Sequence, residues 1–160
     1  MGSFQIEGGH KLDGVIIPQG AKNEALQILC AVLLTKEKIT ISNIPNIVDV
    51  NKLLNLLKGL GVKVNYLSKG KYEFKADKVN MDFLNSSQYK NDAKQLRGSI
   101  MLVGPMLSRF GKGSIPRPGG DKIGRRRLDT HFEGLKLLGA NFNYNREDYF
   151  YDVTADKLSG

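Results

Sequence analysis

The residues best suited to chemistry lie in one short segment of the sequence, RPGGDKIGRRRLDTH at positions 117–131. Three glycines and a proline favour a loop whose backbone can approach a ligand closely. Four arginines and one lysine surround a single early carboxylate, Asp121. At Leu128 the segment enters a helical apolar pattern, and the free N–H groups of a helix N-terminus suit an anion. The segment therefore predicts a phosphate-binding loop.

Apolar spacing predicts the elements that must position this loop. In the first half we expect a strand over 12–17, a helix over 21–34, a strand over 39–42, a helix over 48–60 that ends at Gly61, and a hairpin over 62–75. In the second half we expect a helix that opens at Ala93–Lys94, continues to Phe110 and is kinked by Pro105. A further helix, capped by Asp129 or Thr130, ends at Gly139, and a second hairpin spans 140–153.

The two halves of the chain form an internal repeat. The segment from Leu57 to Tyr66 matches the segment from Leu135 to Tyr144, glycine over glycine and tyrosine over tyrosine. Two units, at about 12–78 and 92–155, each read as strand, helix, strand, helix, strand, strand. A repeat of this length indicates one supersecondary unit used twice, with helices packed on sheets in a mixed α+β fold. The second unit is longer, and the basic loop occupies the extra length.

Composition narrows the class of protein. The chain has 160 residues, of which 41% are hydrophobic, and it carries a net charge of +8 and one cysteine. No apolar run is long enough to cross a bilayer, no signal peptide is recognisable, and one cysteine cannot form an internal disulfide. We therefore expect a cytoplasmic protein without metal or membrane association. Seven basic residues and one acid lie between Arg109 and Arg127, with one aromatic residue, which favours a compact phosphate pocket over nucleic acid.

Several motifs in order resemble the enolpyruvyl transferases, in particular the branch that acts on UDP-N-acetylglucosamine. They are QGAKNEAL at 19–26, NIPNIVDV at 43–50, LRGSI at 96–100 with Gly104–Pro105, and PGGDKIGRRRLDTH at 118–131. The resemblance covers the whole chain, but the family is about two to three times longer. It implies that enolpyruvate passes from phosphoenolpyruvate to the 3-hydroxyl of UDP-N-acetylglucosamine with release of phosphate, as the first committed step of peptidoglycan precursor synthesis. It implies no cofactor.

The resemblance also implies a domain arrangement, an inside-out α/β barrel built from repeated βαβαββ units. Residues 1–20 then supply strands to a second domain, and residues 21–160 form most of the first domain. The substrate site lies between the two domains, so these residues alone should bind substrate weakly and turn over nothing detectable. We accordingly expect the site to need a C-terminal part for its completion.

The resemblance assigns site residues in this chain. Lys22 contacts phosphoenolpyruvate, and Asn23 binds the sugar substrate. Arg97 lies beside the active-site loop, and Arg126 contacts phosphate and uridine. A guanidinium can bind phosphate oxygens in bidentate fashion, which a lysine ammonium cannot. The uracil pocket is shaped by Leu128, Asp129 and His131.

Asp121 departs from the commonest pattern of the family, which has cysteine at this position. That cysteine delivers a proton to the phosphoenolpyruvate methylene and is the residue that fosfomycin alkylates. An ordinary carboxyl, with a pKa near ~3.9, is a poor acid at neutral pH, so the site must raise it. We expect Asp121 to be the acid, and the enzyme to resist fosfomycin. Cys30 lies within an apolar helical pattern and is expected to pack as a small hydrophobic residue.

Other interpretations stay open at this point. A shikimate 3-phosphate enolpyruvyl transferase has the same fold, and a basic nucleic-acid-binding module accounts for the charge but not for the repeat. Three of the site residues also have a non-functional interpretation. Lys22 could be a solvated lysine at the start of a helix, Arg97 could form a structural ion pair, and His131 could have a structural role. Asp49 either caps its helix or helps to hold Lys22 or the sugar site.

Overall fold

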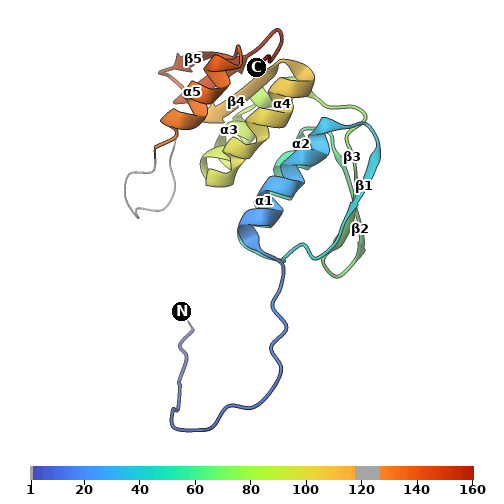
Figure 1. Cartoon of the computed structure of the whole chain (residues 1–160), viewed down its shortest axis with the longest axis vertical. Helices are drawn as coiled ribbons and strands as arrows, with labels where there is room; N and C mark the ends of the chain where they lie inside the picture. Colours follow the sequence, from blue (N-terminus) through green and yellow to red (C-terminus); the bar gives the residue numbers. More distant parts are fainter. Residues whose placement is uncertain (1, 118–126) are drawn as a thin grey trace.

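The computed structural model describes residues 2–117 and 127–160, and Figure 1 shows their arrangement. The first unit contains α1 (Lys22–Ala31) with a 3-10 turn, η1 (Val32–Leu34), then β1 (Lys38–Ile41), α2 (Val48–Gly59), β2 (Lys63–Ser68) and β3 (Lys71–Lys75). A linking region follows, with η2 (Met81–Asn85), α3 (Ser87–Lys94) and η3 (Arg97–Leu102). The second unit contains α4 (Val103–Phe110), β4 (Lys112–Pro116), α5 (Asp129–Leu137), β5 (Asn141–Asn145) and β6 (Phe150–Thr154).

The two units have the same topology. One sheet has the order β1-β3-β2 and the other β4-β6-β5, and every pairing in both is antiparallel. In each unit the hairpin returns its last strand to the centre of the sheet. The expected α+β class is therefore confirmed, and the two units share the order helix, strand, helix, strand, strand.

Equivalent glycines end the second helix of each unit. Gly61 and Gly139 have φ of +87° and +102°, in the left-handed region that favours glycine. After α2, the N–H of Val62 donates to the carbonyl of Leu57, and after α5 the N–H of Ala140 donates to Leu135, both at 2.9 Å. These bonds satisfy carbonyls that the helix leaves free at its C-terminal end. The predicted end of the first of these helices at Gly61 is confirmed.

The second unit differs from its prediction in where helices begin. Ala93 and Lys94 close α3 instead of opening a helix, and the expected long helix is divided into η3 and α4. Pro105 lies in the first turn of α4, where a missing N–H costs no hydrogen bond, so it starts a helix and does not kink one. The predicted cap is also wrong, because Leu128 occupies the N-cap position and Asp129 is the first helical residue.

Neither unit has the leading strand that we predicted, as far as the described residues go. Residues 12–17 carry no strand, and Leu12, Val15, Ile16 and Ile17 are all at least 88% exposed. A strand needs a neighbour for its backbone N–H and C=O groups. The two sheets pair β1 to β6 only among themselves, so this segment has no partner in the described structure. The assignment of residues 1–20 to another domain stays a prediction.

Two apolar clusters fill the fold. The larger lies between α1, α2 and the first sheet and includes Leu29, Leu53, Leu57 and Phe74, each fully buried. The smaller lies in the second unit around Val103, Ile115 and Val153. Phe150 of the second sheet belongs to the larger cluster, so the units share part of one core.

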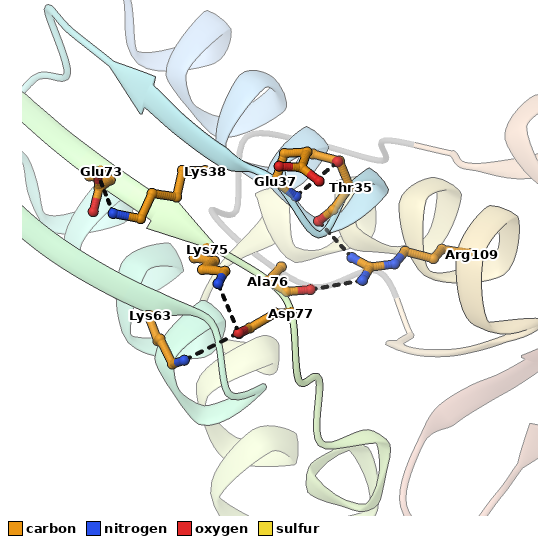
Figure 2. Close-up of polar contacts among 9 residues, drawn as sticks. All are labelled: Thr35, Glu37, Lys38, Lys63, Glu73, Lys75, Ala76, Asp77 and Arg109. Carbon is orange, nitrogen blue, oxygen red and sulfur yellow. Dashed lines mark hydrogen bonds and ion pairs between the residues drawn. The ribbon is translucent and has the colours of Figure 1, made fainter.

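Arg109, in the last turn of α4, fastens the second unit to the first (Figure 2). Its guanidinium donates to the carbonyls of Leu33, Thr35 and Ala76 at 2.7, 2.8 and 2.8 Å. Those carbonyls follow α1 and β3, in two connections that run side by side. Without this charged side chain, three partly buried carbonyl groups lose their donors.

Next to this contact, Asp77 binds two lysines across the hairpin (Figure 2). One of its oxygens lies 3.3 Å from the ammonium groups of both Lys63 and Lys75. Partial burial tends to raise the pKa of Asp77, but the two ammonium groups more than offset it, so that the pKa lies below its usual value. This carboxylate therefore stays ionised and closes the end of the first sheet.

Replacing Arg109 by methionine should lower the free energy of unfolding by about 2–3 kcal/mol, because three hydrogen bonds from a charged donor to partly buried carbonyls are lost together. Urea denaturation measures this. Arg146→Met, the same change at an exposed turn position, serves as the control and should stay within about 0.5 kcal/mol of the parent. Equal effects of the two variants would show that Arg109 does not join the units.

Candidate anion-binding site

Lys22 begins α1, and the backbone before it is held by a close contact. A Cβ built on Gly20 would lie 1.8 Å from the carbonyl oxygen of Asn43, so only glycine fits there. Asn43 itself has φ of +59°, a left-handed conformation that asparagine tolerates better than most residues. The two segments thus fix where α1 starts, beside a pocket of about 90 Å³ lined by Gly20, Ala21, Glu24, Ala25, Ile28 and residues 41–44.

The ammonium of Lys22 forms an ion pair with the carboxylate of Asp49, in the first turn of α2. The lysine side chain is 52% exposed and the aspartate 33%. An ion pair this open adds little stability, but it limits where the ammonium can lie. Asn23 follows on the exposed side of the same helix start. Of the two roles that the sequence left open for Asp49, the structure supports the one that holds Lys22, because no side-chain cap bond forms at the start of α2.

Arg97 is placed next to α1 by the packing of η3. A Cβ on Gly98 would lie 3.0 Å from the side chain of Leu26, one turn after Lys22. This close approach presses the start of η3 against the first turns of α1. Arg97 is half-buried and makes a contact of its own, so its guanidinium is not free.

The two ends of the basic segment meet beside Arg97. A small pocket is lined by Arg97, Lys94, Pro116 and Leu128, together with Ala93, Leu96, Ser99 and Ile100. Pro116 is the last residue of β4, and Leu128 directly precedes α5. Leu128 is buried, which anchors the far end of the segment. The structure therefore brings two basic side chains and both ends of the predicted phosphate loop to one place.

The first turn of α5 carries the remaining described candidates. Asp129 pairs with Arg127, and both side chains are more than half exposed. His131 is exposed as well. None of these three packs in the core, which leaves them available to a ligand at this helix end. Asp121 and Arg126, the central residues of the predicted site, lie outside the described residues.

Cys30 is a core residue, as expected. It is 1% exposed in α1, and its thiol donates to the carbonyl of Leu26. Burial raises the pKa of the Cys30 thiol to about 12. The thiolate, which is the reactive form, is therefore scarce at neutral pH.

Other features of the described residues do not indicate a different ligand-binding site. A larger cavity of about 660 Å³ lies at the C-terminal end of α4, but its lining includes Arg109, whose guanidinium already binds carbonyls. Within residues 2–117 and 127–160, no three His, Cys, Asp or Glu side chains are grouped as a metal site requires. In the same residues, no helix is both long and apolar enough to span a bilayer.

Sequence reasoning missed two features of the site. It did not predict the packing of Gly20 on Asn43, although an asparagine shortly before a proline is a turn signal. It also did not place Lys94 beside Arg97, because it made Lys94 the start of a helix and not its end. A helix end followed by a new 3-10 turn turns the chain sharply, and only tertiary structure shows that.

Comparisons with known proteins agree on one family. The family model described as EPSP synthase (3-phosphoshikimate 1-carboxyvinyltransferase) matches residues 6–160. UDP-N-acetylglucosamine 1-carboxyvinyltransferases from Bacteroides fragilis and Porphyromonas gingivalis are 55% and 52% identical over the whole chain. The enzyme of that name from Bradyrhizobium diazoefficiens is 41% identical over 98% of the chain. The chain spans 37% of the length of the first two relatives and 35% of the third.

Solved structures agree on the fold. The enolpyruvyl transferase NikO from Streptomyces tendae superposes with a TM-score of 0.74 at 19% identity, over 95% of this chain and 32% of that one. An EPSP synthase from Acinetobacter baumannii gives a TM-score of 0.52 at 13% identity, over 89% of this chain and 32% of its own. At such identities the likeness concerns the fold alone.

Gly20→Ala should lower the free energy of unfolding by about 1–3 kcal/mol, because its methyl group must displace the backbone of Asn43. Thermal denaturation measures the change. Gly104→Ala is the matched control, since a Cβ there meets nothing within 4 Å and the position lies in α4. That substitution should be neutral or stabilise by up to about 1 kcal/mol. A Gly20→Ala protein as stable as the parent contradicts the contact.

Proposed function

Because the chain belongs to the EPSP synthase family of enolpyruvyl transferases, we propose that it supplies part of the active site of a UDP-N-acetylglucosamine 1-carboxyvinyltransferase. In this reaction the 3-hydroxyl of the sugar adds to C2 of phosphoenolpyruvate while C3 takes up a proton. Loss of phosphate and of a proton from C3 then gives the enolpyruvyl ether. The product opens peptidoglycan precursor synthesis.

The observation that carries the proposal is the identity of 55% over the whole chain to enzymes with that name. The site motifs lie within the matched residues, and the described ones are supported by geometry. Lys22 is held by Asp49 at the start of α1, and Arg97 lies with Lys94 where the loop leaves β4 and enters α5. Since the chain spans 37% of those relatives, the remaining groups of a complete site are proposed to come from a further, C-terminal part.

The described residues have roles that follow from their charge. The Lys22 ammonium stabilises negative charge at the phosphoenolpyruvate phosphate as addition and elimination proceed. Asp49 restricts that ammonium to one region, so less motion has to be lost when the substrate binds. Arg97 and Arg126 bind anionic oxygens of the substrates, Asn23 binds the sugar, and Leu128, Asp129 and His131 border the uracil.

Asp121 is proposed as the acid that protonates C3 of phosphoenolpyruvate. A carboxyl can perform the transfer if substrate phosphate and exclusion of water favour its protonated form. Fosfomycin acts by alkylating a thiol, and here the only thiol is Cys30, which is buried and protonated. At position 121 the chain therefore lacks the thiol that the antibiotic attacks.

A shikimate 3-phosphate transferase is the second candidate, favoured by the description of the matching family model. Ligand binding distinguishes the two. UDP-N-acetylglucosamine at about ten times its Kd should add about 1.4 kcal/mol of stability and raise the Tm by about 3–6 °C, whereas shikimate 3-phosphate should not. The Lys22→Met and Arg97→Met proteins should respond less to the nucleotide sugar. Stabilisation by shikimate 3-phosphate alone would reverse the choice between the substrates.

Fosfomycin should leave the mass of the protein unchanged after incubation at neutral pH, because no reactive thiolate is present. The Asp121→Cys protein should instead gain one fosfomycin equivalent in the presence of UDP-N-acetylglucosamine. Intact-mass spectrometry measures both, and Cys30→Ala controls for the native cysteine. An adduct on the parent protein would disprove the proposed resistance.

A further inference from the structure

The backbone where the basic segment leaves the second sheet is tied to the turn between β5 and β6. Pro116, the last residue of β4, pairs with Phe150 of β6. One residue further, the N–H of Arg117 donates to the carbonyl of Tyr149 at 2.7 Å. The position of this turn therefore decides where the segment that contains Asp121 begins.

The turn has a conformation that needs support. Tyr149 has φ of +59°, which a bulky residue seldom adopts. The side-chain oxygen of Asn145 accepts hydrogen bonds from the N–H groups of Glu147 and Asp148, at 2.9 and 3.4 Å. Its amide nitrogen donates to the Asp148 carboxylate at 3.3 Å. A side chain from another element can therefore hold the turn in place by binding the Asp148 carboxylate.

The side chain that binds Asp148 is Lys90 of α3. Its ammonium pairs with the Asp148 carboxylate, and the two side chains are 24% and 37% exposed. The lysine of this pair is more enclosed than the lysine of the Lys38–Glu73 pair, in which the two side chains are 64% and 24% exposed. Lys90 and Asp148 belong to segments far apart in the sequence, so the contact fixes α3 relative to the turn.

Two further contacts hold α3 on the second sheet. The hydroxyl of Tyr89, a fully buried residue, donates to the carbonyl of Ser114 in β4 at 2.5 Å. The ammonium of Lys94 lies 5.4 Å from the centre of the Phe150 ring. Because α3 packs against β4 (Figure 1) and also contacts β6 through Phe150, movement of the turn would be transmitted to the strand end beside Arg97.

We propose that Lys90 and Asp148 are positioning residues for the proposed transfer reaction. They hold the β5–β6 turn so that the backbone of Arg117 leaves the sheet in the direction that phosphoenolpyruvate binding requires. The inference rests on the proposed function for the reaction, but the geometry of the pair stands without it. Losing the pair lowers the fraction of molecules with the binding-competent backbone, which raises the apparent Kd and leaves the chemistry of bound substrate unchanged.

Hydrogen exchange of the Arg117 amide tests the geometry in the chain itself. Lys90→Met should speed this exchange by up to about fivefold, the range that a partly exposed ion pair can supply, with amides of β1 and β3 unaffected. Lys38→Met breaks a pair of the same kind on the first sheet and should leave Arg117 unchanged. The double variant Lys90→Asp with Asp148→Lys should restore slow exchange. If Lys90→Met leaves the Arg117 amide unchanged, the inference is wrong.

Kinetics test the role in the reaction, with the family-length enzyme that includes this chain. Lys90→Met should raise KM for phosphoenolpyruvate about threefold to fivefold with kcat nearly constant, and the swapped double variant should recover KM. If the pair is merely structural, Lys90→Met and Lys38→Met should both lower Tm and neither should change KM. That result overturns the positioning role. A parent enzyme that transfers nothing to UDP-N-acetylglucosamine refutes the proposed function instead, while exchange at Arg117 still decides the geometry.

Discussion

One guanidinium group holds the two units of this chain in register. Arg109 binds three carbonyls from the connections after α1 and β3, and its several N–H groups satisfy these carbonyls where the connections lie side by side. A lysine has a single ammonium that cannot reach all three in this planar arrangement. The contact matters for the site because α4 is continuous with η3, which carries Arg97. Fixing α4 on the first unit therefore also fixes Arg97 relative to Lys22.

The site itself is built from helix starts and strand ends, and the elements around it are held by backbone contacts. Gly20 on Asn43 sets where α1 begins, and Gly98 on Leu26 brings η3 to that helix. Both contacts depend on the absence of a side chain. The ion pair of Lys22 and Asp49 lies at the surface of this frame and adds little to its stability. Such an arrangement lets an anion compete for the ammonium of Lys22 without disturbing the core.

Sequence reasoning succeeded where local signals and tertiary packing agree. The leucine spacing of α2 and Gly61 after it specify a buried helix and its end, and both hairpins follow from alternation and turn residues. It failed for 12–17, whose apolar residues suggest a strand but have no partner strand in the described structure. It also failed at Lys94 and Pro105, because the pattern from 96 to 110 is compatible with one helix and the division arises where η3 packs on α1. For the site, motif residues could be named in advance, whereas their ion pairs and neighbours could not. Asp121 and Arg126 stay predictions.

The matching glycine ends of α2 and α5 bear on how such a chain can have arisen. If an ancestral gene duplicated, both copies inherited the same sheet order and the same helix termination, and these still agree. The link between the first strand and the second helix is short in one copy, from Ile41 to Val48, and long in the other, from Pro116 to Asp129. In both copies a strand precedes this link and a helix follows it. One copy could thus evolve new chemistry while its twin preserved the scaffold.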